Sequence, residues 1–191
     1  MKICKDLVDP ALADMILSGS IGVIPCDTVY GLVCAAADPA AVSRLYAAKQ
    51  REHKPGTLIA ADIDQLAALG LKRRYMTPVA QYWPGAVSVV IPCGADLDYL
   101  HQGLSSLAVR IPDGAALQAL LRRTGPLLTS SANQPGQPPA VTLQEAQAYF
   151  GDTLDFYVDG GDYSGHQPST VLRVVDDVVE VLRLGAVTID A

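Results

Sequence analysis

Strand-length apolar segments alternate with helical segments along the chain, and this alternation is the feature that most constrains the fold. Apolar runs such as 86–92 and 106–111 are separated by stretches of helical character. Strands interleaved with helices are typical of α/β proteins. Two adjacent strands, expected at 169–175 and 178–184, add an antiparallel pair. The pattern therefore predicts an α/β fold, α+β-like in its mixed twisted sheet, with flanking helices.

Residues typical of helix ends locate several of the expected elements. Asp38 and Pro39 are the N-cap and first-turn residues that commonly begin a helix, which would run to about Lys49. The proline-rich stretch 131–141 is expected to be an ordered loop beside a site. The other helices are expected at 10–18, 63–70, 76–83, 114–123 and 142–150, and the other strands at 21–25, 57–61, 126–130 and 154–158.

The composition indicates a globular chain with one domain, predicted over residues 1–191. Half of the residues are hydrophobic and 18% are charged, which is unlike a disordered protein. The apolar runs fall far short of the roughly 20 residues that span a bilayer. The N-terminus shows no apolar core of a signal peptide. We therefore expect a cytoplasmic protein with no membrane partner.

Several familiar site types are missing from the sequence. It contains no P-loop, no G-x-G-x-x-G and no G-x-S-x-G motif. Histidines at 53, 101 and 166 lack the spacing of metal ligands, so no protein-held metal site is predicted. The cysteines are scattered, which favours buried free thiols over a metal or disulfide framework: Cys4, Cys26, Cys34 and Cys93.

A cluster of cations at the end of one expected helix indicates an anion site. Lys49, Arg51 and Lys54 lie within six residues, in a chain whose net charge is −6. Such a patch on an acidic protein favours a local anionic ligand over a long polyanion. The alternative is simple capping of the helix C-terminus by cations. The two cations at 49 and 51 converge only if the chain leaves the helix there, as Pro55 and the following glycine suggest.

Two further segments carry polar side chains on expected strands. Ser106, Ala108 and Arg110 share one face of a strand whose other face is apolar. A buried arginine needs an anionic partner, either a protein carboxylate or a ligand carboxylate or phosphate. The second segment, Thr129 to Asn133, brings hydroxyl and amide groups to a strand end, where they suit a phosphate or an ordinary turn.

These segments, in this order, resemble the YrdC-like threonylcarbamoyl-AMP synthase family over residues 8–187. The resemblance implies a twisted sheet with an open, positively charged groove. The matching elements are Pro25…Asp27-Thr28-Val29-Tyr30-Gly31-Leu32, Lys49-x-Arg51, Trp83-Pro84-Gly85, Ser106-x-Ala108-Val109-Arg110-x-Pro112, Ser131-Ala132-Asn133 and Ser169-Thr170-Val171…Arg183-x-Gly185.

The resemblance also implies a reaction and its partners. ATP (with Mg²⁺), L-threonine and bicarbonate would give threonylcarbamoyl-AMP and pyrophosphate. Partner proteins would then use this adenylate to modify adenosine 37 of tRNA (t6A). The implied phosphate cradle, which is also the catalytic set, is Lys49, Arg51, Ser131 and Asn133, with Lys54, Ser106 and Arg183 on the ATP side. The implied threonine site is Thr28, Arg110, Thr129 and Ser169, with Arg110 facing the carboxylate.

The chain departs from the family pattern at a few positions. The family commonly has threonine at Cys26 and proline at Glu52, and many members have a histidine on the strand expected at 57–61, where this chain has none. A second interpretation is therefore a divergent, non-catalytic paralogue that binds tRNA, double-stranded RNA or nucleotide through the basic groove. The basic clusters at 72–74 and 122–123 would extend such a surface, although their ordinary interpretation is a solvated face.

Overall fold

The computed structural model describes residues 1–50, 53–175 and 178–189. Most strands arise where β-branched and other apolar residues are concentrated. Ten strands are found in the described part of the chain: β1 (Lys2–Cys4), β2 (Gly22–Pro25), β3 (Tyr30–Ala35), β4 (Thr57–Ile59), β5 (Val87–Pro92), β6 (Ser106–Arg110), β7 (Leu127–Ser131), β8 (Phe156–Val158), β9 (Thr170–Val175) and β10 (Val178–Arg183).

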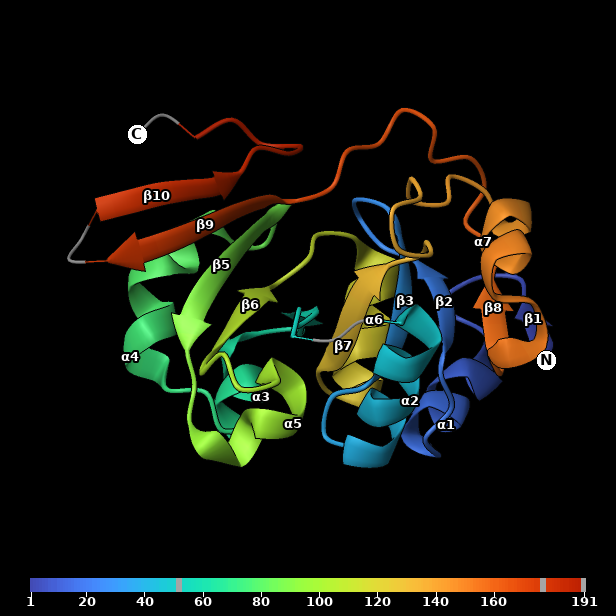
Figure 1. Cartoon of the computed structure of the whole chain (residues 1–191), viewed down its shortest axis with the longest axis horizontal. Coiled ribbons are helices and arrows are strands. Elements are labelled where there is room, and N and C mark those ends of the chain that lie inside the picture. Colours follow the sequence, from blue (N-terminus) through green and yellow to red (C-terminus); the bar gives the residue numbers. More distant parts are fainter. Residues whose placement is uncertain (51–52, 176–177, 190–191) are drawn as a thin grey trace.

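All ten strands join one mixed sheet, in the order β1-β8-β2-β3-β7-β4-β6-β5-β9-β10 (Figure 1). β7 lies near its middle and pairs antiparallel with both β3 and β4. β4 pairs parallel with β6, and β5 pairs parallel with β9. The late hairpin β9–β10 is antiparallel. The predicted α/β class with a mixed, twisted sheet and flanking helices is confirmed.

Helices connect these strands much as the sequence predicts. Asp38 caps the helix that begins at Pro39, because its Oδ1 accepts from the backbone N–H groups of Ala40 (2.9 Å) and Ala41 (3.1 Å). The α-helices are α1 (Pro10–Leu17), α2 (Pro39–Lys49), α3 (Ile63–Ala68), α4 (Arg73–Met76), α5 (Asp98–His101), α6 (Ala115–Thr124) and α7 (Leu143–Phe150). Within the described ranges, no helix has both the length and the apolar character needed to cross a bilayer.

The structure differs from the sequence prediction in short elements. The helix expected at 76–83 is replaced by α4 and a 3₁₀ segment, Thr77–Tyr82. β1 and α5 were not predicted, because three and four residues carry too little periodicity to be recognised. β1 forms only because β8, more than 150 residues later, supplies a parallel partner.

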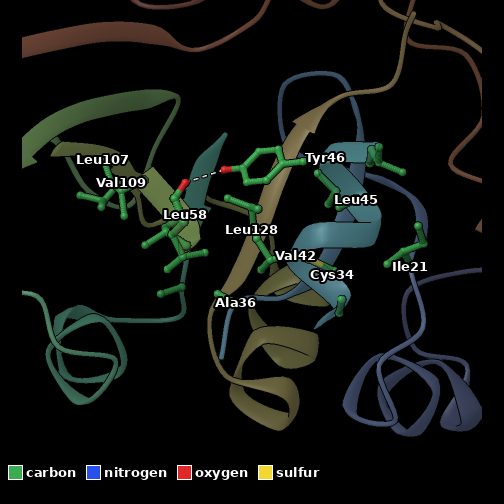
Figure 2. Packing of buried hydrophobic residues seen from close by; sticks show 14 of the residues in the cluster. Ile21, Cys34, Ala36, Val42, Leu45, Tyr46, Leu58, Leu107, Val109 and Leu128 are labelled. Carbon is green, nitrogen blue, oxygen red and sulfur yellow. Dashed lines mark hydrogen bonds between the residues drawn. The ribbon is translucent and has the colours of Figure 1, made fainter. Parts of the chain in front are cut away.

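Two apolar cores lie on opposite faces of the sheet. The larger core packs α2, α3, α5 and α7 against side chains such as Leu58 and Leu128, and Figure 2 shows part of it around Tyr46. The smaller core packs α1 and α6 against Val33, Ile59 and Leu127. Because strand side chains alternate between faces, neighbours such as Leu127 and Leu128 belong to different cores.

Candidate functional site

The polar residues of the site share the sheet face on which α1 and α6 pack. On β7, Leu127 belongs to the core beneath those helices, and Thr129 and Ser131 follow at the same two-residue spacing. On β4 and β6, Ile59 and Arg110 are paired residues on that face. Where α1 and α6 no longer cover this face of the sheet, it is therefore lined by hydroxyl and guanidinium groups instead of apolar side chains.

A first cavity, which we call the strand cavity, lies against these residues. Its floor comes from β3, β4, β6 and β7. Its rim comes from the turn between β2 and β3, the loop before β4, and the residues just before β9. Its charged and polar lining residues are Thr28, Thr57, Arg110, Thr129, Ser130, Ser131, Ser169 and Arg183. The structure thus brings together all four residues of the implied threonine site, Thr28, Arg110, Thr129 and Ser169, from four separate parts of the chain.

Arg110 finds its anionic partner in Asp27, in the turn between β2 and β3. Arg110 Nη1 donates to Asp27 Oδ1, and the two side chains are only 4% and 11% exposed. Asp27 Oδ2 also accepts from the backbone N–H of Asp113, at 3.2 Å. Burial raises the pKa of the Asp27 carboxyl above its ordinary value, although the adjacent guanidinium lowers it in opposition. The pair therefore supplies the anionic partner that the sequence predicts for Arg110, in the form of a protein carboxylate.

The Asp27 contact uses one nitrogen of the Arg110 guanidinium. Arg110 Nε is buried, and it has no hydrogen-bond partner among the residues that the structure describes. A guanidinium presents its donors as a planar fork that can hold a second carboxylate. Arg110 lines the strand cavity, so it can hold Asp27 and a ligand anion at the same time.

Close backbone approaches shape the wall of the strand cavity. A Cβ on Gly31 would lie 2.6 Å from Thr129 Oγ1 and 2.9 Å from Cys26 Sγ, so a larger side chain would displace both polar atoms. A Cβ on Gly56 would lie 2.5 Å from the carbonyl oxygen of Thr129. Burial raises the pKa of the Cys26 thiol to about 11, which keeps it protonated at neutral pH.

The hairpin β9–β10 forms another wall of this cavity. Arg183 Nη2 donates to the carbonyl oxygen of Ser169 at 2.7 Å, and it lies 3.3 Å from the hydroxyl of the same residue. Ser169 Oγ is also hydrogen-bonded to Ser88 Oγ on β5 at 2.9 Å. These contacts fix the Ser169 hydroxyl and bring a second guanidinium to the cavity.

A second cavity, the loop cavity, lies between the end of α2 and the loop that follows β7. Gln50, the C-cap of α2, adopts a left-handed conformation (φ 50°), so the chain leaves the helix immediately after Lys49. Ser131 lines both cavities, so the two are adjacent. The lining residues of the loop cavity are Lys49, Gln50, Lys54, Ser131, Asn133, Pro135 and Gly136.

Lys49 organises the loop cavity through a buried ammonium group. Its Nζ donates to the carbonyl oxygens of Ser131 (2.6 Å) and Asn133 (2.5 Å) and to Asn133 Oδ1 (2.6 Å). Ser131 Oγ donates to the same Oδ1 at 2.6 Å. These contacts place the ammonium group in the lining of the loop cavity, against the loop that follows β7. Lys49 therefore both shapes the loop and supplies a cation for an anionic ligand.

The remaining predicted residues have different outcomes. Lys54 is exposed at the mouth of the loop cavity. Ser106 lines neither cavity, and its hydroxyl lies 3.4 Å from the carbonyl oxygen of Leu104. Arg51, and Glu52 with it, lie outside the described residues. The roles assigned to Ser106 and Arg51 stay predictions.

Sequence reasoning assigned no role to Asp27, Gly31 or Gly56. Asp27 lies inside a motif that carries the family resemblance, and the buried Arg110 was expected to have an anionic partner. Nothing in the sequence, however, connects these two residues, which lie 83 positions apart. The two glycines are explained only by the distance between backbones in the folded chain.

Comparisons with known proteins agree with this geometry. The Sua5/YciO/YrdC family model, described as "Telomere recombination", matches residues 14–185. The chain is 32% identical over 189 residues to a threonylcarbamoyl-AMP synthase of Bacillus subtilis, covering 94% of this chain but 55% of that protein. It is 37% identical over 158 residues to a threonylcarbamoyl-AMP synthase of Chromohalobacter salexigens, covering 80% of this chain and 85% of that one.

A solved structure shows the same fold. The crystal structure of P. abyssi Sua5 complexed with L-threonine superimposes with a TM-score of 0.86 at 26% identity. The match covers 97% of this chain and 58% of that chain. The chain therefore spans little more than half the length of this neighbour and of the Bacillus relative.

Proposed function

Because the chain belongs to the Sua5/YciO/YrdC family, we propose that it is an L-threonylcarbamoyladenylate synthase, a nucleotidyltransferase that uses ATP, L-threonine and bicarbonate. The observation that carries this proposal is the meeting of two unlike cavities at Ser131. One is lined by strand hydroxyls and a buried arginine, and the other by a buried lysine and a loop amide.

The strand cavity suits L-threonine. Arg110 offers a guanidinium to the amino-acid carboxylate, and Thr28, Thr129 and Ser169 offer hydroxyl groups that can donate or accept. The relative crystallised with L-threonine supports this assignment through its shared fold. Arg183, at the border of the strand cavity, would meet the nucleotide.

The loop cavity suits the phosphates of ATP. Lys49 supplies a fixed charge, Lys54 a mobile one at the rim, and Ser131 and Asn133 supply hydroxyl and backbone groups. No carboxylate occurs among the described residues that line this cavity. Mg²⁺ would therefore arrive with ATP, coordinated mainly by phosphate oxygens and water, and would neutralise part of the phosphate charge.

The proposed chemistry joins the contents of the two cavities. The threonine amine and bicarbonate form a carbamate with loss of water. A carbamate oxygen then bonds to the α-phosphorus of ATP as the bond to pyrophosphate breaks. Both reactants are anionic, so cations on either side lower their repulsion and stabilise the leaving pyrophosphate. The contribution of this chain is positioning and electrostatics, with no covalent intermediate on a side chain.

The proposal also covers the use of the product and the location of the protein in the cell. A threonylcarbamoyl adenylate would pass to partner proteins that transfer the group to tRNA, and a cytoplasmic location stays a prediction of the sequence. The alternative, a paralogue that only binds RNA or nucleotide, gains no support from relatives that are called synthases.

The direct test is pyrophosphate release from ATP by the purified protein in Mg²⁺ and bicarbonate, with and without L-threonine. We expect release that requires both threonine and bicarbonate. Arg173→Ala, which removes an exposed ion pair with Glu180 on the β9–β10 hairpin, is the matched control and should release pyrophosphate normally. Binding of ATP without any threonine-dependent release would contradict the proposal and favour the binding paralogue.

A further inference from the structure

The turn between β2 and β3 places a buried carboxylate behind the strand cavity. Asp27 lies between two cavities: Cys26 beside it lines the strand cavity, whereas Asp27 itself lines a neighbouring one with residues at the start of α6. Its carboxylate is therefore not part of the wall that a ligand of the strand cavity would touch. Its contacts with Arg110 and with the backbone N–H of Asp113 hold it behind that wall.

Asp27 limits how Arg110 can meet a ligand. An arginine side chain has several rotatable bonds, so it loses rotamer freedom when it is held in one conformation. The Asp27 carboxylate holds the Nη1 end of the guanidinium and leaves Nε without a partner among the described residues. A carboxylate ligand that pairs with the guanidinium in a bidentate manner needs two donors on one edge. The edge that includes Nε remains for this purpose.

We propose that Asp27 is a positioning residue that presents the Nε edge of Arg110 to the amino-acid carboxylate and so determines how tightly L-threonine binds. This inference rests on the proposed function, because it deepens the assignment of the strand cavity to threonine. The Asp27 carboxylate also neutralises the buried guanidinium when no ligand is bound. This matters because a buried charge without a counter-charge would destabilise the fold.

The inference makes a prediction about two variants and their combination. Asp27→Asn keeps the size of the side chain but removes its charge, and it should weaken L-threonine binding at least tenfold while ATP binding stays within twofold. Arg110→Gln should lose threonine binding to a similar or larger extent. If Asp27 acts through Arg110, the double variant should bind threonine no worse than Arg110→Gln alone, because the pair no longer exists to be broken.

Protein stability provides a separate measurement. Each single variant leaves one buried partner without its counterpart, whereas the double variant replaces the ion pair with two neutral amides. The double variant should therefore unfold at a temperature equal to or above that of each single variant. Because the double variant contains no unpaired buried charge, threonine binding can still be measured on it if a single variant folds poorly.

Asp155→Asn is the matched control. Asp155 Oδ2 accepts from Arg44 Nη2 at 2.9 Å and from a backbone N–H, that of Ile21, at 2.8 Å. It thus repeats the arginine-plus-backbone arrangement of Asp27 outside the cavities, in a more exposed pair. Threonine and ATP binding should be unchanged in this variant, even if its stability falls.

The experiment is calorimetric titration of the full chain and its variants with L-threonine and, separately, with Mg-ATP. A tenfold loss of threonine affinity in Asp27→Asn, absent in the Arg110→Gln background, would support the inference. Equal or tighter threonine binding in Asp27→Asn, or further loss in the double variant, would overturn it. A wild-type protein that binds no L-threonine would instead contradict the proposed function and remove the inference with it.

Discussion

The two cavities that meet at Ser131 are built in opposite ways. The strand cavity takes most of its polar groups from the central strands β4, β6 and β7, and Arg110 and Thr129 within it are almost fully buried. The loop cavity takes its groups from a helix end and a proline-rich loop, with exposed Lys54 at its rim. Strands fix side chains through backbone ladders and packing, whereas loops are held by fewer contacts. The difference suggests a preformed site for a small rigid ligand beside an adaptable site for a flexible polyphosphate.

Of the substitutions that distinguish the two cavities, Arg110→Ala is expected to have the largest effect on activity. Hydrogen bonds to a charged group contribute up to about 3 kcal/mol, so the specificity constant for L-threonine should fall up to about 150-fold. The KM for ATP should change less than threefold, because Arg110 does not line the loop cavity. Steady-state pyrophosphate release at varied threonine and varied ATP measures both.

The same variant should also lose stability, since Asp27 is left as an uncompensated buried carboxylate. The expected loss is about 3–5 kcal/mol in the free energy of unfolding, measured in urea. An equal loss of specificity constant for both substrates would contradict the assignment of Arg110 to the strand cavity alone.

The reactivity of Cys26 is the second test, because it probes whether the strand cavity is a buried environment. Burial raises the pKa of the Cys26 thiol to about 11, and only the thiolate reacts with iodoacetamide. Below that pKa the thiolate fraction rises tenfold per pH unit, so the alkylation rate should rise about 100-fold between pH 7.5 and 9.5. Peptide mapping by mass spectrometry follows the residue.

A Cys26 rate that levels off near pH 8.5 would show an ordinary exposed thiol and a more open cavity. Saturating L-threonine should slow alkylation at every pH, since Cys26 lines the cavity that the ligand would fill. A Cys26→Ser variant identifies the signal that belongs to this residue.

Lys49→Ala should give the next largest effect, and it acts on the loop cavity. Loss of a buried cation that also holds Ser131 and Asn133 should raise the KM for ATP about 30-fold, since charge-assisted contacts contribute about 1.5–3 kcal/mol. Lys54→Ala, which removes an exposed cation at the rim of the same cavity, is the matched control. It should raise the KM for ATP less than fivefold. Equal effects of the two substitutions would mean that burial of Lys49 has no functional role.

Ser131→Ala is expected to give the smallest effect, but on both substrates. Its hydroxyl donates to Asn133 Oδ1 and it borders both cavities, so one lost hydrogen bond should weaken threonine and ATP use about fivefold each. Ser18→Ala, which removes an exposed hydroxyl that donates to the carbonyl oxygen of Met15 outside both cavities, should change either KM less than twofold. A Ser131→Ala effect confined to one substrate would show that the cavities do not communicate through this residue.

The sequence predicted the fold well where local signals are strong. Asp38 and Pro39 located the start of α2, and the apolar runs located β5, β6 and β7 within a residue or so. β1 escaped prediction because its short segment becomes a strand only through pairing with β8. The segment after Lys72 escaped because a one-turn helix begins among exposed cations, where apolar periodicity is absent.

The candidate site was predictable to the extent that its residues lie in recognisable motifs. The four residues Thr28, Arg110, Thr129 and Ser169 were identified and do lie together. The identity of the carboxylate beside Arg110 was not predicted, because it depends on how the turn at Asp27 meets the end of β6 in three dimensions. The contact of Lys49 with its own loop was also invisible, since the sequence suggests a cation but not the oxygens around it.

The measurement that tests the two-cavity account most directly is a crystal structure of the protein with L-threonine and a non-hydrolysable ATP analogue bound together. The account predicts the threonine carboxylate on Arg110 with its amine toward Ser131, and the phosphates beside Lys49 and Asn133. Strand-cavity side chains should keep their present positions, while the loop after β7 adjusts. Threonine bound away from Arg110, or phosphates seated in the strand cavity, would contradict it.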